Sequence, residues 1–118
     1  MKLSLKAKII LTLIASFKDD RYWVPSLPEY YHPLLHETIS IEINHPGDRS
    51  ILKSLITKGL LELNPKKDLS YQWWCRATPS GKALAKSFEF EIKAIGDKQQ
   101  KEALALQEEL NKASKWNR

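Results

Sequence analysis

The stretch 48–61 constrains the fold more than any other part of the chain, because it predicts a helix that leads directly into a strand. Its apolar residues recur at helical spacing, so one face is apolar and the opposite face is polar. We expect Asp48 to cap the start of this helix, and Gly59 suits the left-handed residue after its end. The apolar face holds Ile51, Leu52, Leu55 and Ile56, and the polar face holds Arg49, Ser50, Lys53, Ser54 and Thr57.

The residues after Gly59 predict a β-hairpin. Two runs, 60–63 and 69–77, are rich in residues that favour strands, and the segment between them is rich in turn-forming residues. Lys66 and Lys67 are expected at the exposed tip of this hairpin. The pattern therefore places two cations beyond the end of a small two-stranded element.

Two short motifs around this hairpin carry a family resemblance: Leu55-Ile56-Thr57-Lys58-Gly59-Leu60-Leu61 and Arg76-Ala77-Thr78-Pro79-Ser80-Gly81-Lys82-Ala83-Leu84. Together they resemble the winged helix-turn-helix domain of bacterial regulators of the MarR and PadR type. The resemblance covers roughly residues 6–91. It implies an α+β winged-helix fold, with a three-helix core and a small β-hairpin wing, and a common use in binding DNA.

The N-terminal half is less regular. Residues 1–16 predict a first helix with a broad apolar face; the alternative is a secretory signal, because lysines precede the apolar run. Residues 22–24 favour a short strand. Residues 26–37 can form a second helix that Pro33 interrupts, and the alternation over 38–43 reads locally as a strand. The winged helix-turn-helix fold that the two motifs resemble instead implies a second helix and a tight turn in this region.

The C-terminal part predicts a helix that starts at Pro79 with Thr78 as its cap. We assign 1–95 to the winged-helix domain and 96–118 to a C-terminal helix, with a break or a new start at Gly96. Apolar residues in this last segment repeat at spacings of three and four, as in a short coiled coil. They are expected either to form a homodimer or to pack back on their own domain; they are Ala103, Leu106, Leu110 and Ala113.

The net charge of +5 is unevenly distributed along the chain. Residues 1–43 and 87–118 each carry equal numbers of acidic and basic side chains, so residues 44–86 hold the whole excess. This segment comprises the predicted amphipathic helix, the hairpin and the turn after it. Such clustering indicates a partner with many negative charges. The alternative is scattered lysines that only solubilise the surface.

These observations favour a double-stranded DNA-binding protein, a small transcriptional regulator that acts as a dimer. A basic helix can lie in a major groove while the hairpin tip reaches neighbouring phosphates, and the fork of Arg49 can pair with guanine. The alternative is a winged-helix module that binds another protein and no DNA. The candidate DNA-binding residues are Asn44, His45, Arg49, Ser50, Lys53, Lys66 and Lys67.

No other chemistry stands out. We expect no enzyme activity and no cofactor, since no phosphate-binding glycine loop or nucleophile set is present, and a cytoplasmic location. Cys75, the single cysteine, is expected to be a packed thiol. His32 and His36 would share a helix face, as in some zinc sites, but no third ligand is evident, so we expect no metal. Four aromatic residues can pack in the core or line a small-ligand pocket; they are Tyr22, Trp23, Tyr30 and Tyr31.

Overall fold

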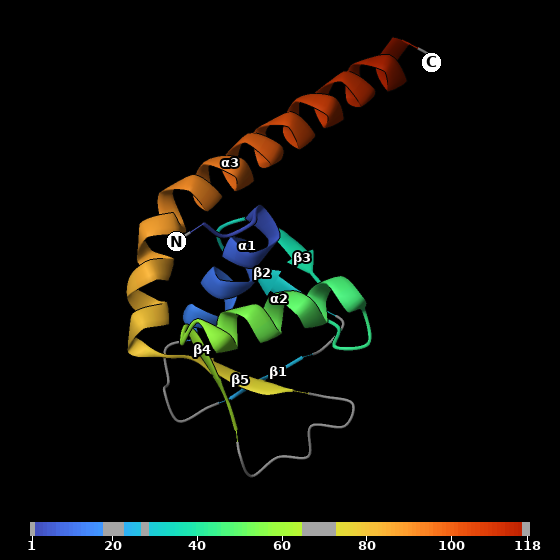
Figure 1. Cartoon of the computed structure of the whole chain (residues 1–118). Coiled ribbons are helices and arrows are strands. Elements are labelled where there is room, and N and C mark those ends of the chain that lie inside the picture. The colour runs from blue at the N-terminus through green and yellow to red at the C-terminus, as the bar shows by residue number, and fades with distance from the viewer. Residues whose placement is uncertain (1, 18–22, 27–28, 65–72, 117–118) are drawn as a thin grey trace.

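Three helices and two small antiparallel sheets make up the described part of the computed structural model, which covers residues 2–17, 23–26, 29–64 and 73–116 (Figure 1). The fold is therefore α+β, as expected. Within these ranges no helix is long and apolar enough to cross a membrane. The elements are α1 (Leu5–Ala15), β1 (Val24–Pro25), β2 (Tyr30–His32), β3 (Glu37–Ile39), α2 (Pro46–Thr57), β4 (Leu61–Leu63), β5 (Trp74–Ala77) and α3 (Pro79–Trp116).

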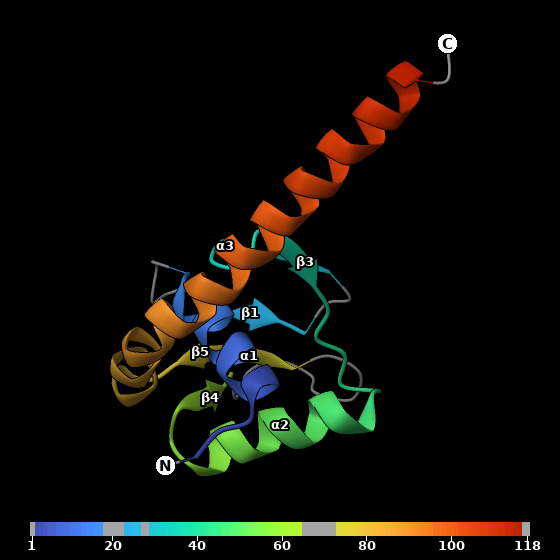
Figure 2. The same cartoon turned by 90° about the horizontal axis from the view of Figure 1, so that it is seen from above.

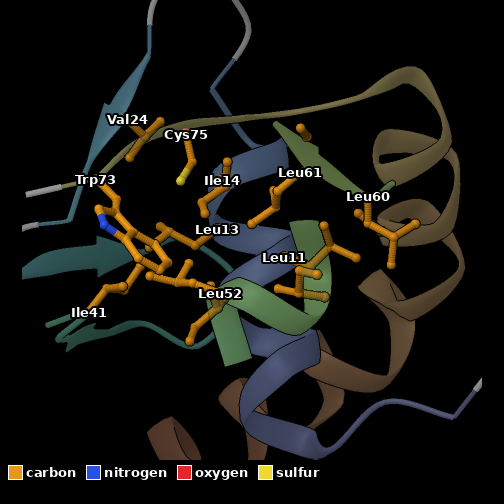
Figure 3. Packing of buried hydrophobic residues seen from close by; sticks show 14 of the residues in the cluster. Leu11, Leu13, Ile14, Val24, Ile41, Leu52, Leu60, Leu61, Trp73 and Cys75 are labelled. Atoms are coloured by element: carbon orange, nitrogen blue, oxygen red, sulfur yellow. The ribbon is translucent and has the colours of Figure 1, made fainter. Parts of the chain in front are cut away.

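Helix α1 lies at the centre of the core and confirms the predicted N-terminal helix. Ser4 caps it, because the Ser4 hydroxyl accepts a hydrogen bond from the Ala7 amide at 3.2 Å. Its apolar residues are buried on several sides, since α1 packs against α2, α3 and β5. Figure 3 shows side chains of α1 meeting those of α2, β4 and β5; the labelled ones from α1 are Leu11, Leu13 and Ile14.

Helix α2 and the strand after it also follow the prediction. Leu52 and Leu55 are buried, and Gly59 has a φ of 75°, the left-handed conformation that ends the helix. The start of the helix differs from the prediction. α2 begins at Pro46, and the ring of His45 accepts a hydrogen bond from the Asp48 amide at 3.3 Å, so His45 is the N-cap and Asp48 is not.

The larger sheet has the strand order β1-β5-β4. Strand β5 is central: Cys75 lies opposite Val24 of β1 on one side and opposite Leu63 of β4 on the other. The short strand expected at 22–24 and the two strands of the hairpin are thus present. The tip of the hairpin, with Lys66 and Lys67, lies outside the described residues.

The helix predicted over residues 26–37 is wrong, because strands β2 and β3 form a hairpin there (Figure 1). Pro33 cannot continue a helix, and His36 adopts a φ of 56° in the turn. The strand predicted over 38–43 pairs with β2 only as far as Ile39. Ile41 and Ile43 are nevertheless buried, so the alternation correctly marked which side chains face the core.

His32 ties this hairpin to α1. It is fully buried; its Nε2 lies 2.9 Å from the Thr12 hydroxyl and 3.1 Å from the Ile9 carbonyl, and its Nδ1 accepts from the Leu34 amide. These partners suit a neutral ring with the proton on Nε2. Burial lowers the pKa of His32 below its ordinary value of 6.5, although the bond to the Ile9 carbonyl opposes this shift.

Helix α3 runs unbroken through Gly96, so the expected break is wrong. A side chain at Gly96 would lie 2.0 Å from the Leu34 carbonyl oxygen, which shows how closely the β2–β3 turn approaches the helix. Beyond this contact α3 extends away from the rest of the protein (Figures 1 and 2). From Lys98 to Lys112 its side chains are exposed, so over these residues the alternative that the helix packs back on its own domain is wrong. The side chain of Ala113, the last residue of the predicted repeat, lies outside the described part of the chain.

We expect Gly96→Ala to destabilise the fold by about 1–3 kcal/mol, because the new methyl group must push the Leu34 backbone away. Helix propensity alone would stabilise the same variant by about 1 kcal/mol. The sign of the change in unfolding free energy therefore shows whether the close contact with Leu34 outweighs helix propensity. Urea unfolding measures it. Gln100→Ala, at an exposed position one turn later, is the control and should change stability little. A more stable Gly96→Ala variant would contradict the close approach.

We expect the free energy of unfolding to fall as the pH drops below 6.5, because the unfolded chain then protonates His32 and the folded chain, with its lowered pKa, does not. The slope from this one group can reach about 1.4 kcal/mol per pH unit. Denaturant unfolding of the wild type and His32→Gln between pH 5 and pH 8 measures it. The variant should lose less stability on acidification than the wild type. Equal losses would show that His32 is not the group responsible.

Candidate nucleic-acid interface

The polar face of α2 lies on the surface of the protein. Arg49, Ser50 and Lys53 are exposed, and together with Pro46 they line a shallow hollow of about 510 Å³. The opposite face of the helix supplies Leu52 and Leu55 to the core. The amphipathic pattern therefore places the cations of α2 outward and close together, as the sequence predicted.

The N-terminal end of α2 presents Asn44 and His45, which are both exposed. The Nδ1 atom of His45 is occupied by the capping bond from the Asp48 amide, so this ring first of all holds the helix start. The His45 side chain is nevertheless exposed, and its Nε2 atom takes no part in this capping bond. Both residues lie in the turn that leads into α2, about one helical turn before Arg49 in the sequence.

Asp48 has a role that the sequence did not reveal. It is only 3% exposed; its Oδ2 accepts from the Glu42 amide at 3.1 Å, and the Lys6 ammonium lies 2.5 Å from its Oδ1. This carboxylate joins the first turn of α2 to the first turn of α1 and to the chain before α2. It thereby fixes the end of α2 that carries Arg49. The only sequence signal was an acidic residue in the first turn of a helix, which fits a cap equally well.

The Arg49 side chain contacts the ring of Trp73, the residue just before β5. Its guanidinium carbon lies 5.7 Å from the centroid of the Trp73 ring, within the range of a cation–π contact. Trp73 is 8% exposed, and its amide donates to the Ser26 hydroxyl at 3.0 Å. The contact restricts the guanidinium while leaving the residue exposed. Trp73, just before β5, and Cys75 and Ala77 within β5 are buried in alternation. The sequence shows this alternation but does not show that Trp73 contacts Arg49.

Arg76 contributes less positive charge to the surface than the sequence suggested. Its guanidinium pairs with the Glu62 carboxylate across the β4–β5 ladder and lies 4.2 Å from the centroid of the Trp23 ring. The excess charge of residues 44–86 is therefore not all available to a partner. Among the described residues of that segment, the exposed cations of α2 and its C-terminal end are Arg49, Lys53 and Lys58.

Of the aromatic residues of the N-terminal third that the structure describes, Tyr30 packs against the core, as one of the two alternatives expected, and Tyr31 does not. Tyr30 packs edge-on against Phe17 and donates its hydroxyl to the Pro25 carbonyl, whereas Tyr31 is 62% exposed. Trp23 is instead covered by Arg76. Tyr22 lies outside the described residues.

The other candidate chemistry is not brought together either. His32 and His36 lie at the start and the end of the β2–β3 turn rather than on one helix face, and His36 contacts Asp97 at 3.1 Å. Within the described ranges no group of three or more histidine, cysteine or acidic residues could hold a metal ion. Cys75 is buried, and burial raises the pKa of its thiol to about 12, so it stays protonated.

The polar face of α2 is thus exposed and positively charged. The start of the helix is fixed by the His45 cap and by the contacts of Asp48 with the Glu42 amide and with Lys6. Such a face can bind phosphates and base edges, because guanidinium, ammonium and hydroxyl groups are the usual partners of both. Comparisons of the chain with protein-family models, with curated proteins and with solved structures found no match.

Proposed function

We propose that the protein binds double-stranded DNA through the polar face of α2 and acts as a small transcriptional regulator. The observation that carries the proposal is the exposed set of Arg49, Ser50 and Lys53 on a helix whose opposite face is buried. An exposed helix with cations on its outer face can enter a major groove, which is wide enough to admit it.

We further propose that the domain is a winged helix in which a hairpin takes the place of the second helix. The order of α1, β1, α2, β4, β5 and α3 supports this view, as does the antiparallel sheet order β1-β5-β4. The β2–β3 hairpin occupies the position in sequence where a helix-turn-helix would have its first helix. The orientation of α2 is then set by its contacts with α1 and the sheet rather than by a preceding helix.

Within this proposal the residues of the α2 face have different tasks. Arg49, steadied by Trp73, is suited to read a guanine with its two-pronged guanidinium. Lys53 and Ser50 would contact phosphates or nearby bases, and Asn44 and His45 would reach the backbone at the start of the helix. Lys66 and Lys67 would add attraction to phosphates that does not depend on sequence.

Fluorescence anisotropy with a labelled generic duplex across a salt series tests the proposal. We expect the logarithm of the binding constant to fall linearly with the logarithm of the salt concentration. The double variant Arg49→Glu with Lys53→Glu should weaken binding by about tenfold or more, because two attractive contacts become repulsive. The matched control is Lys93→Glu with Lys101→Glu, which changes the net charge equally on exposed positions of α3.

If the two double variants weakened binding equally, binding would depend only on net charge, and the α2 face would not be the binding site. An absence of duplex binding even at low salt would contradict the proposal altogether. The α2 cations would then be a solvated surface, and the competing function, a module that binds another protein, would become the working hypothesis.

A further inference from the structure

A hollow of about 550 Å³ lies between the start of α1 and strand β3, and we call it the α1–β3 hollow. Pockets that bind small organic molecules have volumes of roughly 300–1,000 Å³, so it is large enough for a compact ligand. It shares no lining residue with the hollow on the polar face of α2. Tyr30 and Tyr31, two of the aromatic residues that the sequence offered for a small-ligand pocket, do not line it either.

Much of the lining of the α1–β3 hollow is aliphatic. Its most buried lining residues are Ile10 and Leu35. Ile9 and Ile39 are half-buried, and Leu5 is 48% exposed although its side chain is apolar. A ligand that covers these side chains removes apolar surface from water, which is favourable in proportion to the area covered. The ligand that suits this hollow therefore has an apolar body.

Glu37 places a carboxylate beside this aliphatic lining. Ile39 follows two residues later in β3, and side chains two residues apart point to the same face of a strand. The fully buried His32 lies directly opposite Glu37 in the β2–β3 ladder, so all three side chains share the face that packs toward α1. The Glu37 side chain is nevertheless exposed, and none of the ion pairs between described residues uses it. A cation at one end of an apolar molecule would be attracted to this carboxylate.

Lys6 does not favour an anion in the hollow. Among the described residues that line the hollow it is the single cation, and its ammonium lies 2.5 Å from the Asp48 carboxylate. Asp48 is only 3% exposed, so withdrawing Lys6 would leave a buried carboxylate without its counter-ion. An anionic ligand would have to compete for Lys6 at this cost while Glu37 repels it.

We propose that the α1–β3 hollow binds a small amphipathic amine, with its protonated amino group beside Glu37 and its apolar body on the aliphatic lining. Glu29 and Glu42 line an adjoining hollow of about 390 Å³, which shares residues 38–40 with the first. Both glutamates are exposed, and they add to the negative potential around the amino group. An amphipathic amine is the ligand class that uses both the apolar lining and the unpaired carboxylate.

This proposal does not depend on DNA binding, and its test is carried out without DNA. The probe is naphthylmethylamine, titrated into the isotope-labelled full chain while the backbone amides are followed by NMR. We expect saturable shifts of the Thr38 and Ser40 amides with a dissociation constant below about 1 mM. Naphthylmethanol, which has the same ring system and no charge, should bind about two- to fivefold more weakly, the strength of an exposed ion pair.

Two variants test the residues, each with a matched control. Glu37→Gln should remove the preference for the amine over the alcohol, whereas Glu102→Gln, which changes the net charge equally on the outer half of α3, should keep it. Leu5→Ala should weaken the binding of both probes alike by about two- to fivefold, because it removes apolar surface from the hollow. Leu104→Ala truncates a comparably exposed leucine of α3 and should weaken neither.

The absence of saturable shifts at Thr38 and Ser40 with millimolar amine would overturn the site. Equal binding of the amine and the alcohol to the wild type would overturn the ligand class. A preference that survives Glu37→Gln, or that Glu102→Gln removes equally, would overturn the role of Glu37. Equal weakening by the two leucine variants would overturn the role of the aliphatic lining. The amide spectrum of each variant also shows whether it is folded, which is expected because every substituted side chain is exposed.

Discussion

The burial of α1 is the constraint on which the rest of the structure depends. Ile10 and Leu11 are fully buried, and Leu13 and Ile14 almost so, which means that α1 needs apolar neighbours on more than one side. Each such side chain stabilises the fold by about 1.5–3 kcal/mol when it leaves water. Helix α2, strand β5 and helix α3 supply these neighbours.

The enclosure of α1 depends on a few close contacts as well as on apolar area. At Gly81 the backbone of α3 lies so near the Leu60 carbonyl that a side chain would come within 1.9 Å of its oxygen, and Gly96 has the same relation to Leu34. These glycines let α3 approach the β4 side and the β2–β3 turn. His32 joins the β2–β3 hairpin to α1, because its buried ring lies within hydrogen-bond distance of the Thr12 hydroxyl and the Ile9 carbonyl.

The parts of the fold that follow local rules were predictable from the sequence, and the parts that depend on distant partners were not. Helical spacing with Gly59 identified α2, and the turn residues at 64–68 identified the hairpin. The supposed helix over 26–37 failed because β2 and β3 gain their stability from each other and from α1, not from local preference. Asp48 was misjudged as a cap for the same reason: its partner Lys6 is distant in sequence.

A continuous set of contacts links the two surfaces that remain exposed. Lys6 and Asp48 join α1 to the start of α2, and Lys8 joins α1 to α3 through Glu91 at 3.0 Å. Helix α3 has no break at Gly96, so its exposed outer half continues the half that packs on α1. The position of the exposed α2 face relative to the first half of α3 is therefore set through α1, which contacts both helices.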